Sequence, residues 1–302
     1  MLSIARLAMK GPLAAALSAA VYTLLALVFA PFLFVAGGLV CLSGLRHGGN
    51  AGLQVAVSAV VISGGLVFLM TKASTITFVL AVALVPLVGL AAMLRLTESQ
   101  GISITTAAIL AFMLALVMRF SIADVDEFWL QRLTQFRDAV EAQGGQFLTL
   151  AELGMVAGMM HASTILLVML FFSGTLLIGR WWQASLYNPG GFGEEFRRLV
   201  LPRTVILIAA ALSIAALVML NSGRTLGLVG DALLLVMILF AMQGLAVVHY
   251  RGTKKKLANA FFVFLYIFLV LLPHFVGAIL TFVGIIDNVA DFRKLRVGRG
   301  RG

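Results

Sequence analysis

Eight long apolar blocks dominate the sequence and constrain its fold more than any other feature. They cover residues 13–45, 53–70, 75–94, 102–120, 153–179, 203–220, 226–249 and 258–286. A helix needs about twenty apolar residues to cross the hydrocarbon core of a bilayer, and no block shows the alternation that strands of a membrane barrel require. With 62% hydrophobic and 11% charged residues, the composition excludes an ordinary soluble domain. We therefore predict an all-α, polytopic helical membrane bundle that forms a single domain over residues 1–302.

The first and last blocks are longer than one membrane crossing requires. They contain 33 and 29 residues, and each has a proline near its middle, Pro31 in the first and Pro273 in the last. Proline removes a backbone donor and clashes with the preceding helical turn. Each block is therefore either one kinked span or a hairpin of two short segments, which gives eight to ten membrane segments in total.

The 22 lysine and arginine residues distinguish these arrangements, because basic residues concentrate on the cytoplasmic side of membrane proteins. If both long blocks reverse at their prolines and the N-terminus is cytoplasmic, 17 basic residues lie inside and 5 outside. Two single spans give 12 against 10, and an inverted protein in which only the last block reverses gives 15 against 7. We favour ten segments with both the N- and C-termini cytoplasmic. The inverted arrangement remains the second hypothesis.

The longest polar stretch, residues 121–152, carries a net charge of −4 and is suited to export. We predict an amphipathic extracytoplasmic helix at 121–150, capped by Asp124 and ended by Gly144 and Gly145. It would lie on the outer membrane surface or against the bundle, and we favour a packed linker over a helix that docks a partner. Its apolar face comprises Val125, Trp129, Leu133, Phe136 and Val140, which follow helical spacing.

Residues 180–202 have the composition of an interfacial cytoplasmic loop. Aromatic rings of the kind that lie at headgroup depth follow a basic residue, and a turn signal follows them. The glycines precede a short helix that Pro202 ends, but the lysine and hydroxyl of a phosphate-binding loop are missing, so we favour an interfacial elbow. The residues of this motif are Arg180, Trp181, Trp182, Tyr187, Asn188, Pro189, Gly190 and Gly191.

Three strings resemble those of the YybS-like bacterial membrane proteins, a family of unknown function that is distantly similar to the substrate-binding S components of energy-coupling-factor vitamin transporters. The strings are RWWQASLYNPGGFGEEFRRL, QGLAVVHY and GIIDNVADFRK. The resemblance implies a membrane subunit that binds a small solute and meets a membrane-protein partner through small residues of its first helix. Ala15 with Ala19, and Ala16 with Ala20, match that ridge, although a typical S component has six membrane segments.

Small residues four positions apart also favour close helix packing in general. Ala15 and Ala19 have this spacing in the first block, and Gly154 and Gly158 have it in the fifth. We therefore expect both pairs to lie where helices approach each other.

Polar residues inside the apolar blocks are the candidates for a solute or proton site, because burying them in hydrocarbon is costly. The alternative, which we favour, gives each of them a structural role. Gln243 would then bond a neighbouring helix, His274 would satisfy carbonyl groups freed by Pro273, and Asp231 would lie near an interface. The candidates are His161, Asp231, Gln243, His249 and His274.

Catalytic motifs are missing from the sequence. The four histidines lack metal-site spacing, no phosphate-binding or nucleophile motif occurs, and the single cysteine, Cys41, excludes an intramolecular disulfide. We predict no catalytic residue, no metal and no cofactor. Asp287 and Asp291, followed by Arg293, could form a cation or ion-pair site, but we expect solvated helix-end charges because hard cations require more oxygen ligands.

The basic residues gather in a loop, RGTKKK, and in a basic cytoplasmic tail at 291–302. Attraction to anionic lipids explains both, and without interleaved aromatic residues we do not expect nucleic acid as a partner. The leading hypothesis is a non-enzymatic inner-membrane protein that binds a small solute or a membrane-protein partner, in the manner of a transporter membrane subunit. The alternative is a non-transporting cell-envelope assembly or scaffold protein.

Overall fold

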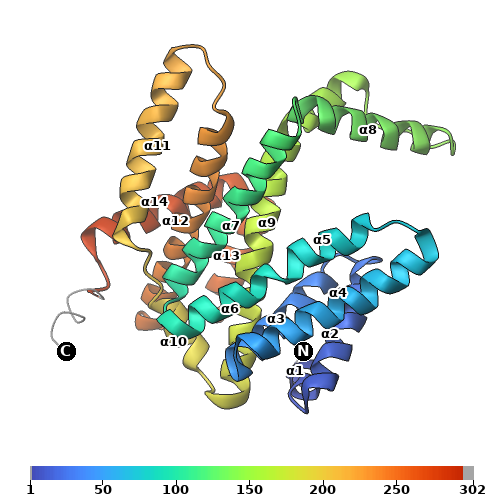
Figure 1. Ribbon diagram of the computed structural model, residues 1–302. Coiled ribbons are helices and arrows are strands. Elements are labelled where there is room, and N and C mark those ends of the chain that lie inside the picture. Colours follow the sequence, from blue (N-terminus) through green and yellow to red (C-terminus); the bar gives the residue numbers. More distant parts are fainter. Residues whose placement is uncertain (1, 295–302) are drawn as a thin grey trace. The chain divides into compact units, whose positions relative to one another are not determined.

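The computed structural model describes residues 2–294, and the secondary structure of these residues consists of α-helices (Figure 1). This confirms the predicted all-α fold. The helices are α1 (Leu2–Ala8), α2 (Pro12–Ala26), α3 (Phe32–His47), α4 (Gly49–Thr71), α5 (Thr75–Leu84), α6 (Pro86–Thr97), α7 (Gln100–Ser121), α8 (Val125–Glu141), α9 (Leu150–Tyr187), α10 (Gly191–Arg197), α11 (Arg203–Asn221), α12 (Gly227–Lys254), α13 (Asn259–Leu271) and α14 (Pro273–Ala290).

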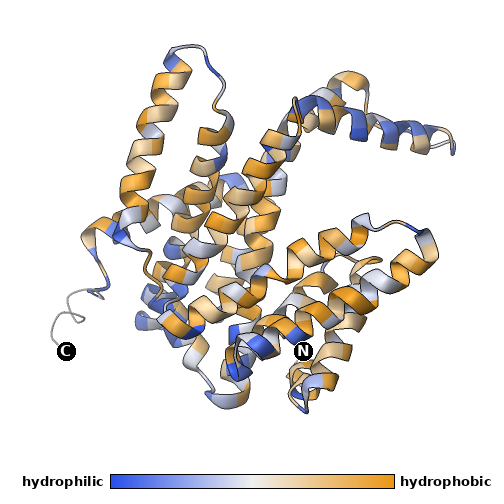
Figure 2. Cartoon of the chain, in the orientation of Figure 1, coloured by the Kyte–Doolittle hydropathy of each residue, from blue (hydrophilic) through white to orange (hydrophobic). Residues whose placement is uncertain are grey.

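Among the described residues, 7 helical segments are long and apolar enough to cross a membrane, and α5 with α6 forms one of them. Three shorter apolar helices, α2, α3 and α13, add to these. Only 17–39% of an 18-residue apolar window in each long segment is buried, which leaves apolar residues on the outside of each unit, as expected for helices in contact with lipid. Figure 2 shows the hydrophilic residues concentrated on α8 and near helix ends. The chain is therefore an integral, multi-pass membrane protein.

The two proline-containing blocks are each divided into two helices. In the first, α2 and α3 pack side by side on either side of Pro31, as the hairpin hypothesis predicts. In the last, the backbone leaves the helical conformation at Leu272 (φ −130°, ψ 56°), and Pro273 begins α14. A single straight span is excluded for both blocks.

The chain forms two compact units. Unit 1 comprises residues 1–107, 171–202 and 239–302, and unit 2 comprises residues 108–170 and 203–238. In unit 1, α3 and α4 are joined by Gly48 alone (φ 96°), a left-handed conformation that glycine adopts without strain. Within the same unit, a side chain at Gly284 would collide with the carbonyl oxygen of Phe240, so glycine allows α14 to approach the α12 backbone closely. Residues 295–302 of the predicted basic tail lie outside the described part of the chain.

Unit 2 contains α8, α11 and parts of α7, α9 and α12. The predicted helix at 121–150 is α8, and the side chain of Asp124 accepts a hydrogen bond from the backbone N–H of Glu127 at 3.0 Å, as expected for its cap. The helix ends at Glu141, shortly before Gly144, which has a positive φ of 81°. Val125 on its apolar face is buried, whereas Phe136 is 56% exposed. The apolar face of α8 is therefore only partly covered within unit 2.

Candidate functional site

Three charged or titratable side chains meet inside unit 2. Arg119 comes from the last turn of α7, His161 from the N-terminal part of α9, and Asp231 from the second turn of α12. The carboxylate of Asp231 accepts hydrogen bonds from Arg119 Nη2 at 2.9 Å, from His161 Nε2 at 3.1 Å, and also from Arg119 Nε. The side chains of His161 and Asp231 are only 5% and 6% exposed, whereas Arg119 is 29% exposed. We call these three residues the unit 2 cluster.

The position of the proton on His161 follows from its partner. A carboxylate paired with arginine is ionised and can only accept hydrogen bonds, so His161 Nε2 carries the proton and donates it to Asp231. In the neutral ring, Nδ1 is then a bare acceptor. This nitrogen is buried and has no hydrogen-bond partner among the described residues. The site therefore presents one buried nitrogen that can accept a hydrogen bond from a small molecule.

The Arg119–Asp231 pair sets the charge of the unit 2 cluster. The guanidinium and the carboxylate cancel, so the cluster carries no net charge while His161 is neutral. Removing one member of such a pair leaves an uncompensated buried charge, which makes the two residues interdependent. The cluster is thus a neutral polar site in an apolar unit, and it suits an uncharged solute or one that delivers a proton.

The structure brings together two of the predicted site residues, His161 and Asp231, and adds Arg119, which sequence reasoning missed. Arg119 lies near the end of its span, and in the favoured topology it is one of the few basic residues on the outer side. A charged residue near the end of an apolar span is stabilised by a nearby opposite charge. The position of Arg119 on the outer side was the available sequence signal for such a partner, and the structure shows that the partner is Asp231.

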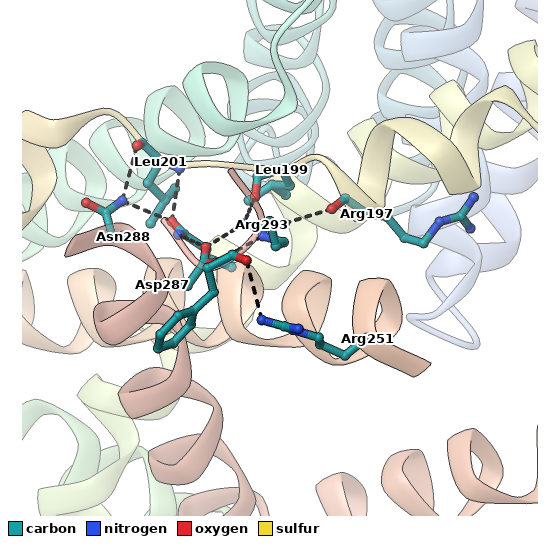
Figure 3. Close-up of polar contacts among 9 residues, drawn as sticks. Arg197, Leu199, Leu201, Arg251, Asp287, Asn288 and Arg293 are labelled. Carbon is teal, nitrogen blue, oxygen red and sulfur yellow. Dashed lines mark hydrogen bonds and ion pairs between the residues drawn. The ribbon is translucent and has the colours of Figure 1, made fainter. Parts of the chain in front are cut away.

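A second polar network lies in unit 1, around the end of α14 (Figure 3). The carboxylate of Asp287 accepts hydrogen bonds from Gln243 Nε2 at 2.7 Å and from Arg293 Nε and Nη2 at 3.2 and 2.7 Å. Arg293 also donates to the backbone carbonyls of Arg197 and Leu199, both at 2.7 Å. The side chains of Arg293 and Asp287 are 0% and 1% exposed. The expectation of solvated helix-end charges was therefore wrong for Asp287, which forms the alternative ion pair with Arg293, because the carbonyls of the 197–199 segment and Gln243 replace water around this pair.

The same network fixes the segment that precedes α11. Gln243 Oε1 accepts from the backbone N–H of Leu201 at 3.0 Å and from Asn288 Nδ2 at 3.1 Å, and Asn288 Nδ2 also donates to the carbonyl of Leu201 at 3.2 Å. We call Gln243, Asp287, Asn288 and Arg293 the α14 clasp. Gln243 thus has the structural role that we favoured, and Arg293 is part of a buried anchor rather than of a lipid-facing tail.

The other two candidate histidines lie elsewhere. His249, in unit 1, bonds the hydroxyl of Tyr266 at 2.8 Å, and its ring stacks on Phe262 with centroids 4.6 Å apart. His274 is exposed and makes no side-chain hydrogen bond to the described residues, so the expected role in satisfying carbonyls beside Pro273 was wrong. The predicted solute or proton residues therefore divide among separate places, and only His161 and Asp231 contact each other.

The segment 180–202 begins with a well-fixed arginine. Arg180 Nε donates to Glu195 at 2.8 Å, and Arg180 Nη1 donates to Gln183 Oε1 at 2.9 Å. The predicted turn Asn188, Pro189, Gly190 and Gly191 is exposed over its first three residues, and Gly190 has a positive φ of 88°. The short helix α10 follows, as the sequence predicts, but it ends at Arg197 with Arg198 as its C-cap, so Pro202 is not the residue that ends it.

The three aromatic residues of this segment have different environments. Trp181 and Tyr187 are 36% and 46% exposed, which agrees with rings at headgroup depth. Trp182 is 0% exposed, and its ring lies against Gly38 of α3 in the interior of unit 1. The prediction that Trp182 anchors the lipid interface was therefore wrong, because adjacent helical residues point in directions about 100° apart.

The small-residue pairs also differ. Ala15 and Ala19 are buried at 3% and 0% exposure, where α2 packs against α3 and α4. Gly154 and Gly158 lie on an exposed face of α9, and a side chain at either would meet nothing within 4 Å. The expected close packing at Gly154 and Gly158 is therefore not formed among the described residues, because that face of α9 is uncovered.

Comparisons of the chain with protein-family models, curated proteins and solved structures found no match. Within residues 2–294, no three His, Cys, Asp or Glu side chains are grouped so that they could hold a metal ion.

Proposed function

We propose that this protein is a membrane subunit that binds a small solute, and that the unit 2 cluster is its recognition site. The observation that carries the proposal is the buried Nδ1 of His161, which has no partner among the described residues although the rest of the ring is held by Asp231. Leaving a buried acceptor unpaired costs about 1–3 kcal/mol, and a bound molecule with an O–H or N–H group would recover that free energy.

The chemistry of the cluster indicates the class of solute. Arg119 and Asp231 neutralise each other, so a strongly charged ligand would find no counterion there. His161 instead offers a hydrogen-bond acceptor in an apolar setting. The site therefore suits an uncharged, largely apolar compound with one donor group, or a weak acid that transfers its proton to His161.

The resemblance to YybS-like membrane proteins, and through them to transporter S components, supports a solute-binding role in a bacterial inner membrane. Under this proposal the chain is not an enzyme, and any energy source would be supplied by a membrane-protein partner. The favoured topology places both the N- and C-termini in the cytoplasm and α8 outside.

A scaffold or assembly role is the second candidate, and one observation favours it. The amphipathic helix α8 leaves part of its apolar face uncovered, including Phe136. A partner protein could cover that face. The unit 2 cluster would then be a structural anchor, and no small molecule would depend on His161.

The experiment that separates the two candidates is a thermal-unfolding screen of the purified full chain in detergent against uncharged, donor-bearing small molecules. We expect at least one compound to raise the Tm of the wild type but not of His161→Gln. The matched control is His249→Gln, which changes a histidine of unit 1 and should leave the response intact. A screen with no stabilising compound, together with co-purification of a partner lost on Phe136→Asp, would favour the scaffold.

A further inference from the structure

A polar pocket of about 430 Å³ lies in unit 1, apart from the α14 clasp. It is formed where α3 and α6 end and where the C-terminal part of α9 meets α10. Such a volume lies within the range that binding pockets for small ligands occupy. The lining residues are Leu45, Leu94, Arg95, Glu98, Arg180, Gln183 and Glu195.

One half of the pocket is rigid. Arg180 binds both carboxylate oxygens of Glu195 and also donates to Gln183. Gln183 in turn donates to the backbone carbonyl of Leu45 at 3.2 Å, and Gln100 Nε2 approaches Glu195 at 3.5 Å. These bonds fix the side chains before any ligand arrives, which lowers the entropic cost of binding.

The other half of the pocket carries two charges that are not used within the protein. Arg95 and Glu98 stand three positions apart at the end of α6, and neither forms an ion pair with any described residue. A side chain at Gly48 would lie 3.0 Å from Arg95 Nη1, so the glycine leaves room for the guanidinium beside the α3–α4 turn. The pocket thus holds one available cation and one available anion beside a fixed ion pair.

The pocket lies where apolar helices end. α3, α6 and α9 all finish at this end of unit 1, and polar connections replace them. Tyr187 is exposed nearby in sequence, and the guanidinium of Arg46 lies 4.1 Å from its ring centroid. Arginine and exposed aromatic residues of this kind are typical of headgroup depth. A lipid headgroup can therefore reach the pocket from the surrounding bilayer.

We propose that this pocket binds a phosphoethanolamine group, with Arg95 on the phosphate and Glu98 on the ammonium. A purely anionic group would face Glu98 and Glu195, and a purely cationic group would face Arg95 and Arg180. A ligand that carries both charges satisfies the two available side chains at once, and each contact is a charge-assisted hydrogen bond. The ligand is the headgroup of phosphatidylethanolamine, or the same group as a soluble compound.

The test is native mass spectrometry of the purified full chain, titrated with phosphatidylethanolamine, phosphatidylcholine and phosphatidylglycerol of identical acyl chains. We expect phosphatidylethanolamine to bind about tenfold more tightly than the other two, because the choline nitrogen has no N–H to donate to Glu98 and glycerol has no charge. Glu98→Gln and Arg95→Gln should each remove this preference. Glu194→Gln and Arg46→Gln change neighbouring charges that do not line the pocket, and both should retain it.

Soluble phosphoethanolamine provides the second arm of the experiment. Displacement of the bound lipid only at a large excess identifies the lipid as the ligand, whereas binding of equal strength without acyl chains identifies the soluble compound; both results support the proposed chemistry. Circular dichroism and gel filtration verify that the variants are folded. Equal binding of the three lipids to the wild type, or a preference that persists in both Glu98→Gln and Arg95→Gln, overturns the proposal.

Discussion

The α14 clasp and the unit 2 cluster contain the same pair of groups, an aspartate and an arginine, but the surroundings of the two pairs differ. In the clasp, the guanidinium is 0% exposed and donates to two backbone carbonyls as well as to Asp287. In the cluster, Arg119 is 29% exposed, and His161 keeps a buried nitrogen without a partner among the described residues. A closed network fixes the fold, whereas an open one keeps a group available for binding.

The largest effect is expected where the clasp is broken. Arg293→Ala should lower the free energy of unfolding by about 3–5 kcal/mol, because it leaves the Asp287 carboxylate buried without its counterion. Unfolding of the purified protein in mixed micelles, followed by circular dichroism, measures this change. The double variant that combines Asp287→Ala and Arg293→Ala should lose less free energy of unfolding than the two single variants lose together, because it leaves no unpaired buried charge.

An exposed ion pair is the matched control for the clasp. Arg198, the C-cap of α10, forms an i,i+4 pair with Glu194 of that helix, and the two side chains are 66% and 58% exposed. Arg198→Ala should change stability by at most about 1 kcal/mol, since exposed pairs contribute little. If Arg293→Ala were as mild as Arg198→Ala, the clasp would not be the structural anchor that its burial indicates.

The unit 2 cluster should respond in a different way. Asp231→Ala is expected to cost about 2–3 kcal/mol, less than the clasp variant, because the partly exposed Arg119 can turn toward water. His161→Gln should change stability by less than about 1 kcal/mol, because the glutamine amide can still donate to Asp231 in place of Nε2 and Nδ1 makes no hydrogen bond that could be lost. The same unfolding assay, run with and without a stabilising compound, checks both values. Destabilisation by His161→Gln equal to that of Asp231→Ala would make the cluster structural and remove the contrast.

Gly284 in unit 1 and Gly154 in unit 2 test whether unit 1 is also more closely packed at its glycines than unit 2. Gly284→Ala should destabilise the protein by about 1–3 kcal/mol, because the added carbon would overlap the Phe240 carbonyl. Gly154→Ala in unit 2 should be neutral or stabilising by up to about 1 kcal/mol, because the site is open and alanine favours helix. Tm values of the two variants make the comparison. A destabilised Gly154→Ala would show that another molecule packs on that face of α9.

Features that depend only on local sequence patterns could be predicted from the sequence. The apolar blocks predicted the helices, because a segment in lipid must satisfy its backbone hydrogen bonds internally. Pro31 divided the first block, and Asp124 capped α8, because both effects act within a single turn. These predictions need no knowledge of which helices become neighbours.

Features that depend on tertiary neighbours could not be predicted. The burial of the Asp287–Arg293 pair depends on the carbonyls of residues 197 and 199, which lie 96 and 94 positions before Arg293 in the sequence. Trp182 and Trp181 are adjacent and chemically identical, yet only Trp182 faces α3. Arg119 could be recognised as anomalous on the outer side, but its pairing with Asp231 required the contact between α7 and α12.

A small effect is also expected at the cap of α8, because the hydrogen bond of this cap is exposed to water. Asp124→Ala removes the acceptor of the Glu127 N–H, and it should reduce the stability of this helix by about 1 kcal/mol. Hydrogen–deuterium exchange of residues 125–141 should accelerate by about fivefold, because 1.4 kcal/mol corresponds to a factor of about ten. Exchange in the clasp segment, residues 197–201, serves as the internal control and should not change. If Asp124→Ala also accelerates exchange in residues 197–201, the two units unfold together. The cluster and the clasp would then differ in their local chemistry, but the two units would not differ in stability.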